Sequence, residues 1–175
     1  PSEYTPGVGM WINESFNAIA PFSGIFTTIT GLGETGNALC TSAINKLSFT
    51  GSTRTAKLVA AACATQMTPV VLECGGKDPV IVAADAHIDR AVDVTIWSAM
   101  ANAGQSCIGA ERVYVDEKVA DAFIEKAIAL ASTLTAGAPG EGNYGASTMP
   151  SQIGVITSHI KAAIKDGGKF AYGSM

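Results

Sequence analysis

This chain of 175 residues has little charge, and least of all positive charge. Charged side chains make up 15% of it, and 11 lysines and arginines stand against 15 aspartates and glutamates. A nucleic-acid partner requires a basic stripe, so this balance argues against one. No apolar run approaches the roughly 20 residues of a membrane helix, and the first ten residues lack the basic start and apolar stretch of a signal peptide. We therefore expect neither a nucleic-acid nor a membrane partner.

The sequence also lacks any Cys-x-x-Cys pair, which leaves a zinc ribbon or a dithiol redox motif unsupported. Its hydrophobic content of 47% is enough for a core without disulfide staples. The expectation is a reducing, cytoplasmic compartment and no metal site. In that setting each of the four cysteines is either core filler or a reactive thiol. They are Cys40, Cys63, Cys74 and Cys107.

Strand and helix patterns alternate along the chain. Runs rich in β-branched residues predict strands at 25–30, 46–50, 70–72, 79–82 and 111–115. Helices are expected at 34–42, 53–65, 88–100, 119–130 and 153–164, the fourth with Asp116 as its N-cap. Strands that alternate with helices pair in parallel through right-handed crossovers. The sequence therefore predicts an α/β fold, with a domain seam near residues 73–78.

Two glycine-containing turns are candidates for phosphate binding. Residues 31–36 fit G-x-G-x-x-G, but no Asp or Glu lies at 35–72 to hold a ribose. An ordinary glycine turn is therefore the preferred interpretation of this motif. The second turn holds Gly51 and Ser52 between a strand and a helix, where backbone and hydroxyl can meet an anion. Taken alone, this turn is better interpreted as an ordinary helix cap.

Two residues could carry covalent chemistry. Glu73 ends a buried strand beside the double glycine at 75–76, and the end of a parallel strand is where α/β enzymes place catalytic groups. A solvated surface acid is the alternative. Cys107 lies between Gly104 and Gly109, where open backbone suits a nucleophile whose amide must reach an oxyanion. A buried structural thiol is the alternative for this cysteine.

Four motifs, in this order, resemble the aldehyde dehydrogenase family. They are Pro-Ser-Glu-Tyr-Thr-Pro at 1–6, Phe-Thr-Gly-Ser at 49–52, Glu-Cys-Gly-Gly-Lys at 73–77 and Asn-Ala-Gly-Gln-Ser-Cys at 102–107. The interval of 34 residues from Glu73 to Cys107 is also similar to that of the family. Cys74 replaces the usual leucine of the second glycine motif, and Ala56 stands where the family often has glycine.

The resemblance implies parallel three-layer sheets of the aldehyde dehydrogenase type, present here in part. Residues 1–73 would be the second half of the cofactor-binding domain, and residues 74–175 the first half of the catalytic domain. The implied activity is oxidation of a small-molecule aldehyde to a carboxylic acid with NAD, or with NADP, in a protein that forms a homo-oligomer at full length. Two rival interpretations are an inactive fragment or interaction module, and a cysteine acyltransferase or hydrolase without a cofactor.

The same resemblance implies roles for single residues. Cys107 would attack the aldehyde to give a thiohemiacetal and then a thioester, and Glu73 would activate water or prime the thiol. Ser52, beside Gly51, would contact the cofactor pyrophosphate. Glu3 would bind the adenosine ribose hydroxyls and so favour NAD over NADP.

The resemblance also bears on the substrate. Enzymes of the family that oxidise succinate semialdehyde often carry an arginine just before the Asn of the cysteine motif, and here that position is Ala101. Arg112 lies in a predicted strand and is interpreted as structural. The sequence therefore predicts no clamp for a substrate carboxylate within this chain.

Overall fold

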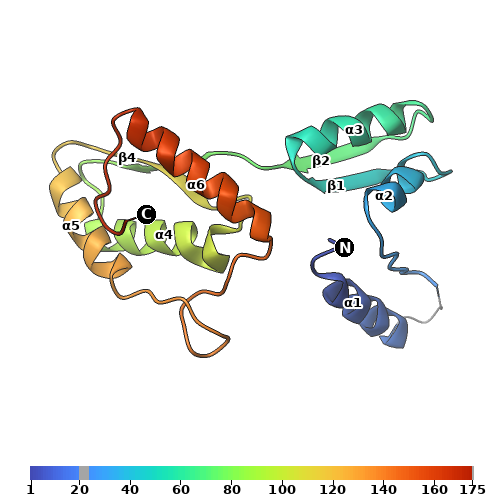
Figure 1. The fold of residues 1–175 in the computed structure, drawn as a ribbon, viewed down its shortest axis with the longest axis horizontal. Coiled ribbons are helices and arrows are strands. Elements are labelled where there is room, and N and C mark those ends of the chain that lie inside the picture. Colours follow the sequence, from blue (N-terminus) through green and yellow to red (C-terminus); the bar gives the residue numbers. More distant parts are fainter. Residues whose placement is uncertain (20–23, 175) are drawn as a thin grey trace. The chain divides into compact units, whose positions relative to one another are not determined.

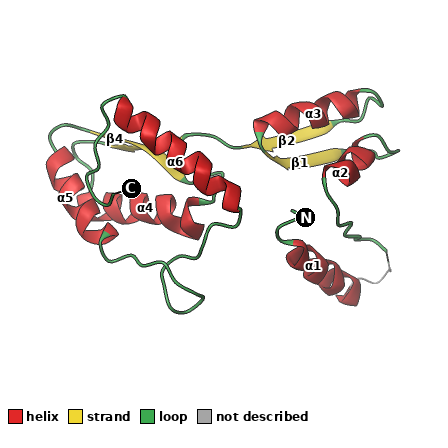
Figure 2. Cartoon of the chain, viewed as in Figure 1, coloured by secondary structure: helices red, strands yellow, loops and turns green. Residues whose placement is uncertain are grey.

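The computed structural model describes residues 1–19 and 24–174, and it divides into two compact units, Pro1–Gly75 and Gly76–Met175. Each unit holds one pair of parallel strands with helices beside it (Figures 1 and 2). The predicted α/β class and the parallel pairing are therefore confirmed. Among the described residues, no helix is long and apolar enough to cross a membrane.

The first unit is built around one strand–helix–strand crossover. Its elements are α1 (Pro6–Ile19), α2 (Gly33–Cys40), β1 (Leu47–Gly51), α3 (Thr53–Ala64) and β2 (Val70–Cys74). Strands β1 and β2 pair in parallel from Leu47 opposite Val70 to Gly51 opposite Cys74. The alanine-rich sequence of α3 has neither glycine nor proline, which favours a helix. Helix α3 packs on both strands and on α2.

The second unit has the larger apolar interior. Its elements are β3 (Asp78–Val82), α4 (Ile88–Met100), the 3-10 turn η1 (Ala101–Gly104), β4 (Ala110–Val115), α5 (Ala120–Ala131) and α6 (Pro150–Lys165). Strands β3 and β4 are parallel, with a register irregularity between Asp78 and Pro79. Val82, Val92 and Phe123 form the buried cluster where β3, α4 and α5 meet.

The predicted strand at 25–30 is wrong, because this segment has no strand partner in the described structure. Its polar groups bond to α1 instead. The Thr28 amide donates to Asn13 Oδ1 at 2.9 Å, and the Thr28 hydroxyl donates to the Gly9 carbonyl at 2.9 Å. Asn17 Nδ2 donates to the Phe26 carbonyl at 3.1 Å. β-branched residues favour an extended backbone, but a strand also needs a neighbour to complete its ladder.

The predicted N-cap at Asp116 is also wrong. Helix α5 begins at Ala120, and its N-cap is Val119, which offers no side-chain cap. The Asp116 carboxylate instead accepts from the Lys118 amide at 3.0 Å, and its carbonyl accepts from the Val119 amide at 3.0 Å. Asp116 therefore stabilises the turn between β4 and α5, one turn ahead of the helix.

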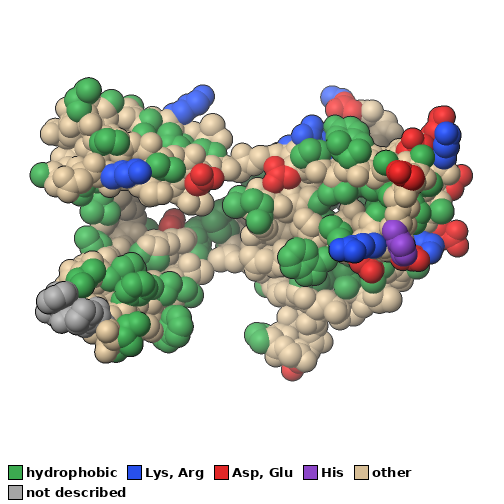
Figure 3. All heavy atoms as spheres, turned by 180° about the vertical axis from the view of Figure 1, so that it is seen from behind, with side chains coloured by type: hydrophobic (Ala, Val, Ile, Leu, Met, Phe, Trp, Pro, Cys, Tyr) green, Lys and Arg blue, Asp and Glu red, His purple; other side chains and the backbone are tan. Residues whose placement is uncertain are grey.

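Large apolar side chains remain exposed on both units, and Figure 3 shows them scattered among few charged groups. Trp11 on α1 is 67% exposed, and Trp97 on α4 is 73% exposed. Helix α6 has no buried residue, although isoleucines recur along it at helical spacing. Exposed apolar area of this extent is typical of surfaces that meet other protein.

Candidate active site

The pairing of β1 with β2 brings three of the predicted site residues to one edge of a sheet. Thr50 lies opposite Glu73, and Gly51 lies opposite Cys74, at the carboxyl ends of both strands. Gly51 and Ser52 follow from that end of β1 into α3. Glu73 is exposed there. A carboxylate and a helix N-terminus therefore share the edge where ligands of parallel sheets bind.

The turn at Ser52 has the chemistry of an anion site. Ser52 is the N-cap of α3, and its hydroxyl oxygen accepts from the Thr55 amide at 3.2 Å. The first turn of α3 carries no acidic residue, so no carboxylate competes for its free amides. A Cβ added at Gly51 would lie 2.5 Å from the Phe49 ring. The exposed, glycine-preceded helix start fits the pyrophosphate of a dinucleotide.

Glu3 lies in the turn before α1, and its carboxylate is exposed. The Ser2 hydroxyl donates to Glu3 Oε2 at 3.4 Å and accepts from the Tyr4 amide at 3.2 Å. An exposed carboxylate with few internal partners can accept hydrogen bonds from vicinal hydroxyls, as a ribose requires. The glycine motif at 31–36 differs in character, because its last two glycines lie inside α2.

Cys107 lies in the second unit, in the loop between η1 and β4, and it is exposed. Ahead of it the backbone turns left-handed over three consecutive residues: Asn102 at φ 53°, Ala103 at φ 58° and Gly104 at φ 72°. Asparagine and glycine tolerate this conformation, whereas alanine does so at a cost in free energy. The loop then closes on Gly109, whose amide donates to the Ser106 carbonyl at 3.2 Å.

The other cysteines have different environments. Cys40 and Cys63 are buried between α2 and α3, with 3% and 0% of their surface exposed. Burial raises the pKa of the Cys40 thiol, and the neighbouring Cys63 thiol raises it further. Cys74 is half-buried at the end of β2. The exposed thiol is therefore the one in the glycine-flanked loop.

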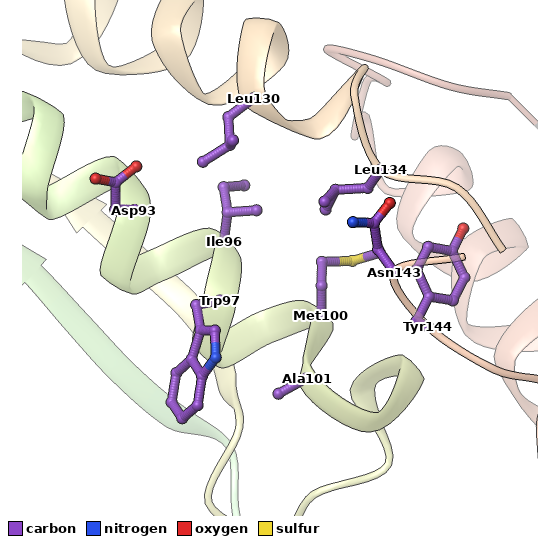
Figure 4. A pocket seen from close by; sticks show the side chains of 9 residues that line it. All are labelled: Asp93, Ile96, Trp97, Met100, Ala101, Leu130, Leu134, Asn143 and Tyr144. Carbon is purple, nitrogen blue, oxygen red and sulfur yellow. The ribbon is translucent and has the colours of Figure 1, made fainter. Parts of the chain in front are cut away.

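A cavity of about 420 Å³ opens beside the turn that leads to this cysteine. Figure 4 shows it between α4, the end of α5 and the segment that follows. Its lining residues are Asp93, Ile96, Trp97, Met100, Ala101, Leu130, Leu134, Asn143 and Tyr144. None of these described residues is a lysine or an arginine. Asp93 is the charged residue among them and it is acidic, so the cavity disfavours an anionic group such as a carboxylate.

Two further interactions were missed from the sequence. The Gln105 side chain bonds to the backbone of 146–148, more than 40 residues away. Arg112 Nε donates to the Lys77 carbonyl at 2.7 Å, and Lys77 pairs with Glu111. Arg112 thus joins β4 to the loop before β3, as a structural residue would. Short-range patterns carry no signal for contacts between such distant positions.

Glu73 and Cys107 belong to different units, so their joint action on one substrate stays a prediction. The structure does bring Gly51, Ser52 and Glu73 together, through the register of β1 and β2. Within residues 1–19 and 24–174, no cluster of three or more His, Cys, Asp or Glu side chains could hold a metal ion.

Comparison with known proteins gives a consistent result. The model of the aldehyde dehydrogenase family matches residues 1–175. The D-glyceraldehyde dehydrogenase (NADP(+)) of Thermoplasma acidophilum is 33% identical over 99% of this chain and 36% of its own length. The mitochondrial benzaldehyde dehydrogenase of Antirrhinum majus is 36% identical over 98% of this chain and 33% of its own.

Solved structures agree with these relatives. A lactaldehyde dehydrogenase matches 100% of this chain and 38% of its own, with a TM-score of 0.94 and 30% identity. The NAD-dependent aldehyde dehydrogenase from Sinorhizobium meliloti matches 95% of this chain and 34% of its own, with a TM-score of 0.91 and 32% identity. The chain thus spans about a third of the length of the relatives it matches.

Proposed function

The chain belongs to the aldehyde dehydrogenase family, and on this premise we propose that it carries the nucleophile and the general base of an NAD-dependent enzyme that oxidises an aldehyde to a carboxylic acid. The observation that carries the proposal is the exposure of Cys107 in the loop that follows a left-handed turn, while Cys40 and Cys63 are buried. In this proposal residues 1–73 are the second half of the cofactor-binding domain. Residues 74–175 are the first half of the catalytic domain.

Cys107 performs the first step. Its thiolate attacks the carbonyl carbon of the aldehyde, a C–S bond forms, and the carbonyl oxygen becomes the oxyanion of a thiohemiacetal. The Cys107 backbone amide donates to that oxyanion. When bound, the nicotinamide supplies the acceptor for the hydride that leaves this carbon, so that a thioester remains on Cys107.

Glu73 performs the second step. Its carboxylate takes a proton from a water molecule, and the water oxygen attacks the thioester carbon. The C–S bond breaks, the carboxylic acid leaves, and Cys107 returns as the thiolate. The exposure of Glu73 at the end of β2 supports access of water to this carboxylate.

Gly51 and Ser52 hold the pyrophosphate of the cofactor at the start of α3, and Glu3 holds the adenosine ribose. We expect NAD to be preferred, because a 2′-phosphate would meet the negative charge of Glu3. The ratio of kcat/KM for the two cofactors in the full-length enzyme tests this. A clear preference for NADP would contradict it, and one relative is named as an NADP(+) enzyme.

The proposed substrate is an aldehyde without an obligatory carboxylate. The cavity beside Ala101 has no cationic lining residue, and Arg112 is engaged with the Lys77 carbonyl. Butanal and succinate semialdehyde should therefore react with similar kcat/KM. A preference above a hundredfold for the semialdehyde, about 2.7 kcal/mol, would mean that a clamp exists elsewhere in the enzyme.

The decisive experiment labels the thiols and then stops the second step. Limiting iodoacetamide should modify Cys107 ahead of the other three cysteines, as read by peptide mass spectrometry. In the full-length enzyme, Glu73→Gln should let the Cys107 thioester accumulate with aldehyde and NAD, with little change in NAD affinity. Glu125→Gln, an exposed acid on α5, is the matched control.

The outcomes separate the alternatives. Transfer of an acyl group from a thioester through Cys107 to a second thiol, without reduction of NAD by any aldehyde, would favour an acyltransferase instead. Preferential labelling of another cysteine would remove the nucleophile assignment altogether. We also propose that the full-length protein is a homo-oligomer, which sedimentation of that protein tests.

A further inference from the structure

The Gln105 side chain links two segments that are far apart in the sequence. Its Nε2 donates to the Asn102 carbonyl at 2.9 Å and to the Ala146 carbonyl at 3.4 Å. Its Oε1 accepts from the Thr148 amide at 2.7 Å. Both ends of one half-buried amide are therefore occupied by backbone groups, on its own turn and on the segment before α6.

The turn that Gln105 closes is the left-handed one ahead of the cysteine. Asn102 and Gln105 are bonded reciprocally, because Asn102 Nδ2 donates to the Gln105 carbonyl at 3.1 Å. The Gln105 amide also donates to the Asn102 carbonyl at 3.1 Å. A left-handed alanine persists only where its surroundings hold it in place. The bonds of Asn102 and Gln105 provide that restraint.

The side chain at position 105 must both donate and accept hydrogen bonds, which a side-chain amide can do. A glutamine donates and accepts at once, whereas a glutamate only accepts when ionised. Glutamate here could still accept from the Thr148 amide, but its charge would face the Asn102 and Ala146 carbonyls. Alanine would lose all three side-chain bonds and would keep only the backbone bonds of residue 105 with Asn102. Gln105→Glu therefore removes only the donor of the side chain, whereas Gln105→Ala removes the donor and the acceptor together.

We propose that Gln105 is a positioning residue for Cys107. By tethering the left-handed turn to Ala146 and Thr148, it fixes the backbone two residues ahead of the thiol and so aims the Cys107 amide at the oxygen of a reacting carbonyl. This inference rests on the proposed function, since it assigns Gln105 a part in the same acyl chemistry. Gln105 itself touches no reacting atom.

The test compares two reactions of the same thiol in the full-length protein. Alkylation by iodoacetamide develops no oxyanion, whereas acylation by p-nitrophenyl acetate does, so only the ester reports on the amide. The acylation rate is measured as the release of nitrophenolate that depends on Cys107. The alkylation rate is measured by mass spectrometry of the peptide that contains Cys107. The ratio of ester to alkylation rates should fall at least tenfold in Gln105→Ala and Gln105→Glu. The control Gln152→Ala, on α6, should stay within twofold of the parent.

Hydrogen exchange tests the bonds from Gln105 to Ala146 and Thr148 (the tether) without any reaction at Cys107. The Thr148 amide should exchange faster in Gln105→Ala and stay protected in Gln105→Glu, which keeps the acceptor. Unchanged exchange in Gln105→Ala would overturn the tether. Faster exchange with an unchanged rate ratio would overturn the positioning role. If the parent Cys107 is alkylated but never acylated, the proposed function fails and the positioning role fails with it, while exchange still decides whether the tether exists.

Discussion

The two units of the chain bury different kinds of side chain beneath the same kind of sheet. Among the described residues of Pro1–Gly75, the buried apolar ones are Cys40, Ala56 and Cys63, all small. In Gly76–Met175 they are Val82, Val92 and Phe123, with partly buried aliphatic residues packed around them. Both units are a parallel strand pair with a helix in the crossover.

This difference indicates how each unit is stabilised. The first unit brings α2 and α3 close together through small side chains, so its helices tolerate little added volume. The second unit fills the space between β3, α4 and α5 with bulk, so it tolerates little removed volume. We therefore expect larger side chains to destabilise the first unit, and smaller side chains to destabilise the second.

The largest effect is expected for Phe123→Ala. Removing a buried ring from the cluster of the second unit should cost about 3–5 kcal/mol of its unfolding free energy. Hydrogen exchange of peptides from 76–174 measures this, with peptides from 1–75 as an internal reference. The control is Phe16→Ala, because Phe16 is half exposed and stacks on Phe26 in the first unit. Equal losses in the two variants would break the comparison.

The converse substitution is Ala56→Leu. Ala56 is 3% exposed on α3, and added methylenes there should cost about 1–3 kcal/mol by overpacking. Ala61→Leu places the same side chain at an exposed position of the same helix and should be nearly neutral. Denaturant unfolding of both variants decides the matter. A neutral Ala56→Leu would show that the first unit is loosely packed.

A smaller effect is expected at the start of α3. Ser52→Ala removes the side-chain cap and should cost about 1 kcal/mol. Ser52→Asp keeps a capping oxygen but places a negative charge where the pyrophosphate is proposed to bind. We expect Ser52→Asp to restore stability without restoring NAD affinity, as measured by calorimetry in the full-length enzyme. Full recovery of affinity would argue against a phosphate at this turn.

The smallest effect concerns Asp89, which pairs with Lys126 between α4 and α5. The hydrogen bond and the charge of Lys126 lower the pKa of Asp89 below its ordinary 3.8. The folded state thus favours the ionised form, so the contribution is present above pH 3.8 and is lost as the pH falls through the lowered value. Asp89→Asn should lower the melting temperature slightly at pH 7. The difference should shrink in high salt and vanish at low pH; a difference that persists at low pH would exclude the ion pair.

Local patterns predicted much of the fold because the elements are short and punctuated by glycine or proline. All five expected helices and four of the five expected strands are present. Helix α1 was not expected, since Gly7 and Gly9 lower the helical propensity of its first turns. The predicted strand at 25–30 is absent because, within the part of the chain that the structure describes, no neighbouring strand pairs with it. A local pattern shows that a segment can be extended, but not whether a distant segment lies beside it.

Some features of the candidate site could likewise be predicted from the sequence, and others could not. Motif chemistry proposes Cys107, Glu73 and Ser52, because thiol, carboxylate and hydroxyl groups are recognisable from residue type, and their roles stay predictions. The left-handed turn at Ala103 and the Gln105 bonds were not, since alanine carries no signal for positive φ and glutamine none for a contact 43 residues away. Residue type thus indicates which groups could react, and tertiary contacts determine how they are held.

The strand register also bears on the order in which the chain folds. Each sheet pairs two strands joined by a single crossover, from Leu47 to Val70 in one and from Asp78 to Ala110 in the other. Short loops close early, because their entropic cost is small. During synthesis from the N-terminus β2 leaves the ribosome before β4, so the first sheet can pair before the second. The Ser52 turn would then form before the cysteine loop has left the ribosome.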